Sequence, residues 1–222
     1  LDAGASEINI EIEEGGRALI RVSDNGCGMS REDAPLAFSR HATSKLQRLG
    51  NLNRISSLGF RGEALPSIAS VAKVRLVTKR AEDAAGSEVL IEGGDLKAVS
   101  RAAAQAGTSI EVRSLFFNTP ARRKFLKQEK TEELRVKNWV LHSSVVHPQI
   151  RYRLIADGRE ILNLPPREHS RARAEEMFRG SSVNFSKALG PLRIEGLLLH
   201  PSLAQSESST CLIFVNHGNN LF

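Results

Sequence analysis

The sequence contains very few cysteines and large aromatic side chains. Its 222 residues include two cysteines, one tryptophan and one tyrosine. Cys27 and Cys211 lie far apart and show no metal-ligand spacing, so a disulfide framework and a cysteine metal site are disfavoured and a reducing, cytoplasmic setting is expected. The scarcity of Trp and Tyr also argues against an aromatic platform that stacks single-stranded nucleic acid.

Long apolar runs are missing as well. No stretch approaches the roughly 18 consecutive apolar residues of a membrane-spanning helix, and the start lacks the pattern of a signal peptide. The opening "LDAGASEINI" has no initiator methionine and is typical of the end of a helix, so we expect a fragment. A hydrophobic content of 41% suffices for a buried core. The net charge of +6 is compatible with a polyanionic partner but is also found on many ordinary proteins.

What is present is the alternation typical of strands, interrupted by short helical patterns. Ile8, Ile10 and Ile12 alternate with polar residues, and "EEGG" then turns the chain into an antiparallel strand at 18–22. Further strands are predicted at 73–78, 87–92, 108–112, 150–155, 160–162, 192–199 and 211–215, and helices at 30–38, 63–71, 131–146 and 172–178, with another opening at "NTPARRKFL". The pattern predicts an α+β sandwich of helices over a mixed sheet. The proline-bearing "NLPPREHS" is the candidate domain boundary.

The segment "SDNGCGM", residues 23–29, directly follows the second strand and allows two interpretations. Asn-Gly is among the commonest turn dipeptides, so the segment suits an ordinary strand end and turn. Alternatively, the Asp24 carboxylate can accept a hydrogen bond from an exocyclic amine, while Gly26 and Gly28 let the backbone approach a flat ring. The second interpretation is an adenine site.

Two further segments suit the binding of phosphate. "RHATSK", residues 40–45, offers two hydroxyls and an ammonium group, although it also suits a solvated loop. "GFRGEAL", residues 59–65, places two glycines and Arg61 before an apolar helical pattern, and a helix start attracts anions. Each signal alone is weak, and no GxxxxGK[ST] phosphate loop occurs.

The three segments occur in order within 42 residues, from Asp24 to Leu65, and this order resembles the nucleotide pocket of the GHKL superfamily of ATPases. Five segments are similar to the MutL family of mismatch-repair ATPases in particular: "LDAGA", "DNGCGM", "RHATSK", "LGFRGEALPSIASVA" and "LFFNTPARRKFLK". The resemblance runs from Leu1 to about Val215. It implies a GHKL-type sandwich with a mostly antiparallel sheet as domain 1–163, followed by the start of a domain resembling ribosomal protein S5 at 164–222.

The resemblance also implies a nucleotide-binding role for matched residues. Asp24 would read the adenine amino group, Gly26 and Gly28 would shape the pocket, and Thr108 would close on the adenine side. The remaining implied contacts, from the first family motif, the lid and the phosphate-binding turn, are Ala3, Thr43, Ser44, Lys45, Gly59, Phe60, Arg61, Gly62, Glu63, Ala64 and Leu65. No catalytic residue and no metal ligand is assigned within the chain.

Partners and cofactors follow from the same resemblance. It implies ATP with Mg2+, a MutS-type mismatch-recognition protein, a downstream nuclease or helicase, non-specific binding to the DNA backbone, a nucleotide-dependent homodimer, and a place in the bacterial cytoplasm near the nucleoid. Alternatives are a DNA-binding module with a vestigial pocket, or a GHKL ATPase of another function such as a chaperone or kinase.

The sequence departs from the family pattern at both ends. The general-base glutamate and the magnesium-holding asparagine of the family precede "LDAG", so both are expected upstream of Leu1, and hydrolysis by this fragment is expected to be impaired. The family continues from "FVNGR" toward a lysine that reaches the phosphates, whereas this chain reads "FVNHGNNLF" and lacks that lysine.

Residues 121–137 form a basic stretch with two interpretations. Seven cations accompany three glutamates there: Arg122, Arg123, Lys124, Lys127, Lys130, Arg135 and Lys137 against Glu129, Glu132 and Glu133. Such a stretch suits a solvated helix face with lysine–glutamate pairs. It also suits contact with the phosphates of DNA, which requires cations but little sequence recognition.

Overall fold

The computed structural model describes residues 1–39, 63–178, 182–190 and 192–199. The chain divides into two compact units. One comprises Leu1–Lys137 with Tyr152–Asn163, and the other comprises Asn138–Arg151 with Leu164–Phe222. The predicted assignment of domains to 1–163 and 164–222 stays a prediction.

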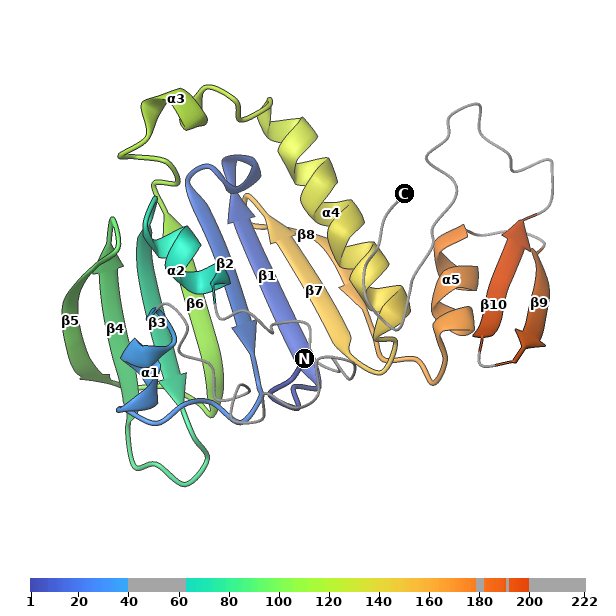
Figure 1. Cartoon of the computed structure of the whole chain (residues 1–222), viewed down its shortest axis with the longest axis horizontal. Helices are drawn as coiled ribbons and strands as arrows, with labels where there is room; N and C mark the ends of the chain where they lie inside the picture. The colour runs from blue at the N-terminus through green and yellow to red at the C-terminus, as the bar shows by residue number, and fades with distance from the viewer. Residues whose placement is uncertain (40–62, 179–181, 191, 200–222) are drawn as a thin grey trace. The chain divides into compact units, whose positions relative to one another are not determined.

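An eight-stranded sheet organises the first unit (Figure 1). Its strands lie in the order β5-β4-β3-β6-β2-β1-β7-β8. The pairings β1–β2, β2–β6, β3–β6, β3–β4 and β4–β5 are antiparallel. The strands are β1 (Glu7–Glu13), β2 (Leu19–Asp24), β3 (Lys73–Lys79), β4 (Gly86–Glu92), β5 (Asp95–Ala102), β6 (Gly107–Arg113), β7 (Arg151–Ala156) and β8 (Arg159–Leu164). The predicted α+β class with a mostly antiparallel sheet is confirmed.

Short helices and one long helix accompany the sheet. They are the 3-10 turn η1 (Glu14–Gly16), α1 (Asp33–Leu36), α2 (Ala64–Ala69), α3 (Pro120–Arg123), α4 (Glu129–Val146) and α5 (Ser170–Phe178). The predicted helix at 30–38 was too long, since α1 comprises only Asp33–Leu36. Ser30 precedes it, and its hydroxyl accepts the Asp33 N–H at 3.0 Å, as an N-cap does. The predicted helix at 63–71 likewise shortens to Ala64–Ala69.

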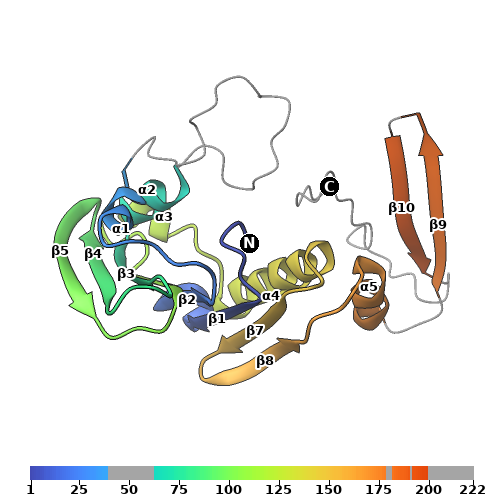
Figure 2. The same cartoon turned by 90° about the horizontal axis from the view of Figure 1, so that it is seen from below.

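One face of the sheet packs against α1 and α2. Register pairing places Val112, Val74 and Ile91 in one rung, since residues paired across antiparallel strands point to the same side. This rung is buried in a cluster with Ala34 of α1 and Ala69 of α2. Figure 2 shows both helices on the same side of β3 and β4. We call this side of the sheet the helix-covered face.

Turn residues connect the neighbouring strands as their sequences require. Asp157 and Gly158 have φ values of 48° and 75°, which suits a two-residue hairpin turn between β7 and β8, as the Asp-Gly dipeptide favours. The Asp157 N–H donates to the Ile12 carbonyl at 3.0 Å, and the Asp157 carboxylate accepts the Glu14 N–H at 2.9 Å. The hairpin turn is thereby held at the end of β1.

The second unit contains α5 and a hairpin formed by β9 (Ser182–Leu189) and β10 (Leu192–Leu199). The predicted strand at 192–199 is confirmed, whereas β9 was not predicted. Arg173 of α5 is fully buried, pairs with Glu176 at 2.8 Å and donates to the Pro165 carbonyl. The predicted strand at 211–215 lies outside the described residues.

Candidate functional site

The ends of β2, β6 and β3 bring three polar side chains into one rung of the sheet. Asp24 pairs with Thr108, and Thr108 pairs with Thr78. All three point to the helix-covered face, because Asp24 follows Val22 by two residues and Thr108 precedes Ile110 by two. We call this set the polar rung. Two of its members, Asp24 and Thr108, are predicted site residues, and the fold brings them together from 84 residues apart in sequence (108 − 24).

The loop that follows Asp24 is fixed by backbone contacts. The Gly26 N–H donates to Asp24 Oδ1 at 2.8 Å, which orients the carboxylate. The Cys27 N–H donates to the Ala3 carbonyl at 2.9 Å, so the predicted residue Ala3 lies against this loop. Asn25 Oδ1 accepts the N–H groups of Ser6 and Glu7 at 2.9 and 3.0 Å. The segment at residues 3–7 is therefore hydrogen-bonded to the loop that follows Asp24.

Glycine is required at two positions because backbones meet there. At Gly28, with φ of 68°, a Cβ would lie 2.1 Å from the Lys79 carbonyl oxygen. At Gly107, with φ of 123°, a Cβ would lie 2.1 Å from the Asp24 carbonyl oxygen. No side chain fits at either distance, so these glycines set how closely the loop, β3 and β6 approach one another. Gly28 was predicted as a site residue on another ground, the approach of the backbone to a flat ring, whereas Gly107 was not predicted.

Thr78 is a further residue of the site that sequence reasoning missed. Its hydroxyl accepts the Met29 N–H at 2.9 Å, donates to the Gly107 carbonyl at 3.1 Å and lies 3.0 Å from the Thr108 hydroxyl. In the sequence, Thr78 is only a hydroxyl residue within the strand "KVRLVTK". Its importance follows from the register of β3 with β6, which no local pattern displays.

An apolar surface adjoins the polar rung. Val22 and Ile110 form the next rung on the same face, and Val22 is 40% exposed although it points to the helix-covered face. An exposed valine beside an oriented carboxylate suits a ligand that is flat and apolar over its ring and polar at its edge. The residues present therefore fit an adenine ring.

The predicted phosphate-binding residues are described only in part. Thr43, Ser44, Lys45, Gly59, Phe60, Arg61 and Gly62 lie outside the described residues. Glu63 immediately precedes α2 and its carbonyl accepts the Ser67 N–H at 3.0 Å, while Ala64 and Leu65 form the first turn. Their predicted contact with phosphate stays a prediction.

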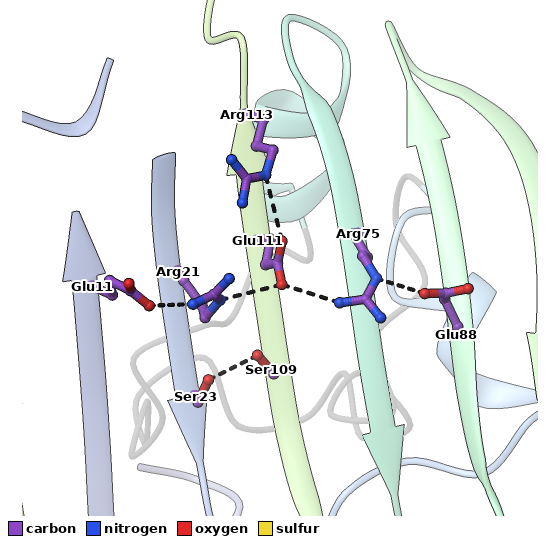
Figure 3. A network of polar contacts seen from close by, with 8 residues as sticks. All are labelled: Glu11, Arg21, Ser23, Arg75, Glu88, Ser109, Glu111 and Arg113. Atoms are coloured by element: carbon purple, nitrogen blue, oxygen red, sulfur yellow. Dashed lines mark hydrogen bonds and ion pairs between the residues drawn. The ribbon is translucent and has the colours of Figure 1, made fainter. Parts of the chain in front are cut away.

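The opposite face of the sheet carries a network of ion pairs (Figure 3). The Glu111 carboxylate lies 3.2 Å from Arg21 Nε and 3.1 Å from Arg75 Nη1, and Arg75 Nε continues to Glu88 at 2.5 Å. Burial alone would raise the pKa of Glu111, but the charges and hydrogen bonds of Arg21 and Arg75 outweigh burial and lower it. The pKa of Arg75 is raised, chiefly by its hydrogen bond to Glu88. The network joins β2, β6, β3 and β4.

The basic stretch lies on α3, α4 and the segment between them. Arg135 pairs with Glu132 at 3.3 Å, as a solvated helix face would have it. Within the described ranges, five exposed cations of the stretch form no ion pair: Arg122, Arg123, Lys124, Lys127 and Lys130. Phe125 is 80% exposed among them. The Arg135–Glu132 pair therefore favours a solvated helix face, whereas the five exposed cations favour contact with the phosphates of DNA.

No described helix has the length and apolar character needed to cross a membrane. Among the same residues, no group of three or more His, Cys, Asp and Glu side chains is placed to hold a metal ion.

Comparison with known proteins places this site in a family. Residues 1–112 match the family described as histidine kinase-, DNA gyrase B- and HSP90-like ATPases. The chain is 44% identical over 221 residues to the DNA mismatch repair protein MutL of Syntrophotalea carbinolica, covering 97% of this chain and 35% of that protein. It is 41% identical over 220 residues to MutL of Neisseria meningitidis serogroup A, covering 98% and 33%. The chain thus spans about a third of the length of these relatives.

Solved structures give the same result. The Aquifex aeolicus MutL ATPase domain complexed with ADP superposes with a TM-score of 0.69 at 33% identity, covering 84% of this chain and 67% of that one. A crystal structure of the ATPase domain of the mismatch repair endonuclease MutL from the same organism gives 0.67 at 27% identity, covering 94% and 68%. The chain belongs to the histidine kinase-, DNA gyrase B- and HSP90-like ATPases, and within them it is an N-terminal ATPase region of the MutL type.

Proposed function

We propose that the chain binds ATP, with the adenine ring over Val22 and its amino group at Asp24. The observation that supports this proposal is the polar rung, where the Gly26 N–H orients the Asp24 carboxylate beside Thr108. A carboxylate held in this way accepts a hydrogen bond from an amine at the ring edge. The similar Aquifex aeolicus MutL ATPase domain is complexed with ADP, which supports the binding of an adenine nucleotide.

Asp24→Asn tests this assignment. The amide keeps the shape of the carboxylate but replaces one acceptor by a donor, which faces the amine donor of adenine. We expect the Kd for ATP to rise by about tenfold or more, since a charged hydrogen bond contributes roughly 1.5–3 kcal/mol. Isothermal titration with ATP in the complete protein that carries this chain gives the value.

Asp95→Asn is the matched control. This substitution is the same chemical change on the edge strand β5, where the Asp95 carboxylate lies 3.3 Å from Lys97 Nζ. Its Kd for ATP is expected to equal that of the wild type. An unchanged Kd in Asp24→Asn would remove the adenine assignment.

In the complete protein, we propose, ATP binding acts as a switch in bacterial DNA mismatch repair. Two segments, Thr43–Lys45 and Gly59–Leu65, would bind the phosphates. The free energy of binding would then favour one arrangement of residues 39–62, which we call the lid. That arrangement would favour a homodimer and engagement of a MutS-type protein and a downstream nuclease or helicase. Rescue of a mutator phenotype by the complete gene tests this role and separates it from a chaperone or kinase function.

Hydrolysis requires a group that activates water and a ligand that holds Mg2+, and neither role is assigned to a residue of this chain. We therefore propose that a polypeptide limited to these residues binds ATP but hydrolyses it slowly. When bound, Mg2+ would neutralise phosphate charge.

DNA binding is a second candidate function, favoured by the five cations of residues 122–130 that form no ion pair with another described residue. Each cation that contacts a phosphate releases counterions, so binding weakens as salt rises. Replacing Lys124 and Lys127 by Glu is expected to weaken DNA binding and to flatten its dependence on salt, measured by filter binding with and without ATP. Equal affinity with and without ATP would instead favour a DNA-binding module with a vestigial pocket.

A further inference from the structure

The Thr78 hydroxyl links the loop that ends at Met29 to strand β6, beside the candidate adenine site. Its side chain is 1% exposed, at the register position next to Thr108. On one side it accepts the Met29 N–H at 2.9 Å, from the end of the loop that contains Gly28. On the other side it contacts the Gly107 carbonyl at 3.1 Å and the Thr108 hydroxyl at 3.0 Å. Thr78 does not itself border the apolar surface at Val22.

The number of protons and lone pairs fixes the direction of each bond. A hydroxyl has one proton to donate and two lone pairs to accept with. The Gly107 carbonyl has no proton, so the Thr78 proton goes to it. One Thr78 lone pair accepts the Met29 N–H, and the other is left for the Thr108 hydroxyl. Thr108 therefore spends its only proton on Thr78 and offers the ligand lone pairs alone.

This direction of the Thr108 hydroxyl matters because its partner in β2 also accepts. The Asp24 carboxylate, which already accepts the Gly26 N–H, offers further acceptor positions beside Thr108. An edge of two acceptors attracts a ring with an amino group and opposes a ring that carries a carbonyl at the same position. Adenine and hypoxanthine differ at this edge by a 6-amino group against a 6-oxo group, and N1 carries a proton only in hypoxanthine. With both acceptors at position 6, the two amino protons of adenine are favoured over the 6-oxo group.

We propose that Thr78 is a positioning residue that determines base specificity, holding the Thr108 hydroxyl as an acceptor so that the site prefers 6-amino over 6-oxo purine nucleotides. The inference rests on the proposed binding of ATP and names a specificity device of that same site. Thr78 acts through Thr108 and through the Met29 backbone, without contacting the nucleotide.

Thr78→Val tests the inference in the complete protein, with ATP and inosine triphosphate as the two probes. Valine keeps the shape of threonine but removes the hydroxyl, so the Thr108 proton becomes free to turn toward the ligand. We define the ratio as the Kd for inosine triphosphate divided by the Kd for ATP. We expect this ratio to fall by roughly five- to tenfold, because one hydrogen bond contributes about 1 kcal/mol net. Thr78→Ser keeps the hydroxyl and is expected to show the same ratio as the wild type.

Ser87→Ala is the matched control. Ser87 is also a buried hydroxyl residue and is the register partner of Thr78 on β4, on the side away from Thr108. Its loss is expected to leave the ratio unchanged. A merely structural effect of Thr78→Val would weaken both nucleotides together and keep the ratio, and that result would overturn the inference.

Thr108→Val supplies a second test that holds even where Thr78→Val fails to fold. Removing the acceptor itself is expected to lower the ratio of Kd values, and Thr78→Val added to Thr108→Val is expected to lower it no further. An unchanged ratio in Thr108→Val overturns the inference while ATP binding stands. A wild-type protein that binds neither nucleotide overturns the proposed function and this inference with it.

Discussion

Glu111 is the residue on which the charged face of the sheet converges. Its side chain is 12% exposed, and three arginines surround it, with Arg113 Nε at 3.6 Å in addition to Arg21 and Arg75. Without the carboxylate, the guanidinium groups of Arg21 on β2, Arg75 on β3 and Arg113 on β6 would lie around this position with no negative charge between them. Like charges in that arrangement repel, so Glu111 stabilises the centre of the sheet.

We expect Glu111→Gln to lower the free energy of unfolding at pH 7 by about 1–3 kcal/mol. Because the folded-state pKa lies below the ordinary value of 4.5, the stabilisation is fully present above that value and is lost as the pH falls through the folded-state pKa. The difference in the free energy of unfolding between Glu111→Gln and the wild type should therefore become smaller in acid. Denaturant unfolding over a pH series measures it.

Glu92→Gln serves as the control for this prediction. Glu92 pairs with Lys73 at 2.8 Å on a more exposed part of the same sheet, with 41% of its side chain accessible. Exposed pairs contribute little, so its loss is expected to stay below about 1 kcal/mol. An equal loss in both variants would contradict the central role of Glu111.

Residues of the candidate site differ in how far the sequence could reveal them. Asp24, Gly26 and Gly28 form a local motif at a strand end, and their type and spacing carried the prediction. Thr78 and Gly107 act through partners on other strands. Their roles depend on register, which is set by packing across the whole sheet and is invisible in a local pattern.

The short helix α1 shows how one cap supports a packed element. Ser30 Oγ accepts the Asp33 N–H at 3.0 Å and lies 2.7 Å from the Asp33 carboxylate, and Ala34 behind it is fully buried in the core. With four residues, α1 is too short to be stable by itself, so the cap and the contact of Ala34 must hold it.

Ser30→Ala is therefore expected to lower the free energy of unfolding by about 1 kcal/mol, the usual effect of removing a helix cap. Thermal or denaturant unfolding measures the loss. Ser67→Ala, at an exposed position of α2, is the control and is expected to have little effect. Should both variants unfold alike, the Ser30 hydroxyl would have no capping role.

Strand β5 illustrates an element that periodicity could not predict. Its pairing with β4 shifts between Leu90 and Ile91, so that Leu90 pairs with Ala98 and Ile91 with Leu96. The extra residue, Lys97, interrupts the alternation of apolar and polar side chains from which the other strands were predicted. The neighbouring turn, Gly93–Gly94 with φ values of 60° and 93°, was the available signal.

Across the whole chain, α4 belongs to both compact units. Residues up to Lys137 cluster with the large sheet, and Asn138–Arg151 cluster with the segment from Leu164 onward. Within the second unit, the Arg167 N–H donates to the Pro148 carbonyl at 2.7 Å. A cut at the predicted boundary therefore removes contacts from the end of α4.

Truncation after Asn163 is expected to speed amide exchange in Asn138–Val146 by about tenfold or more, because local opening becomes easier when packed contacts are lost. Amides of β3 and β6 should change little. Hydrogen exchange of the full and truncated chains makes the comparison. Unchanged exchange in α4 would support 1–163 as an autonomous domain.

The order of strands has a consequence for how the protein is made. β1 lies between β2 and β7, and the contact of Glu14 with Asp157 joins residues 143 apart. During synthesis, β1 must wait with one edge unpaired until the β7–β8 hairpin leaves the ribosome. Such distant pairing makes folding slow, so the nascent chain is most prone to aggregate before residue 164 has been added.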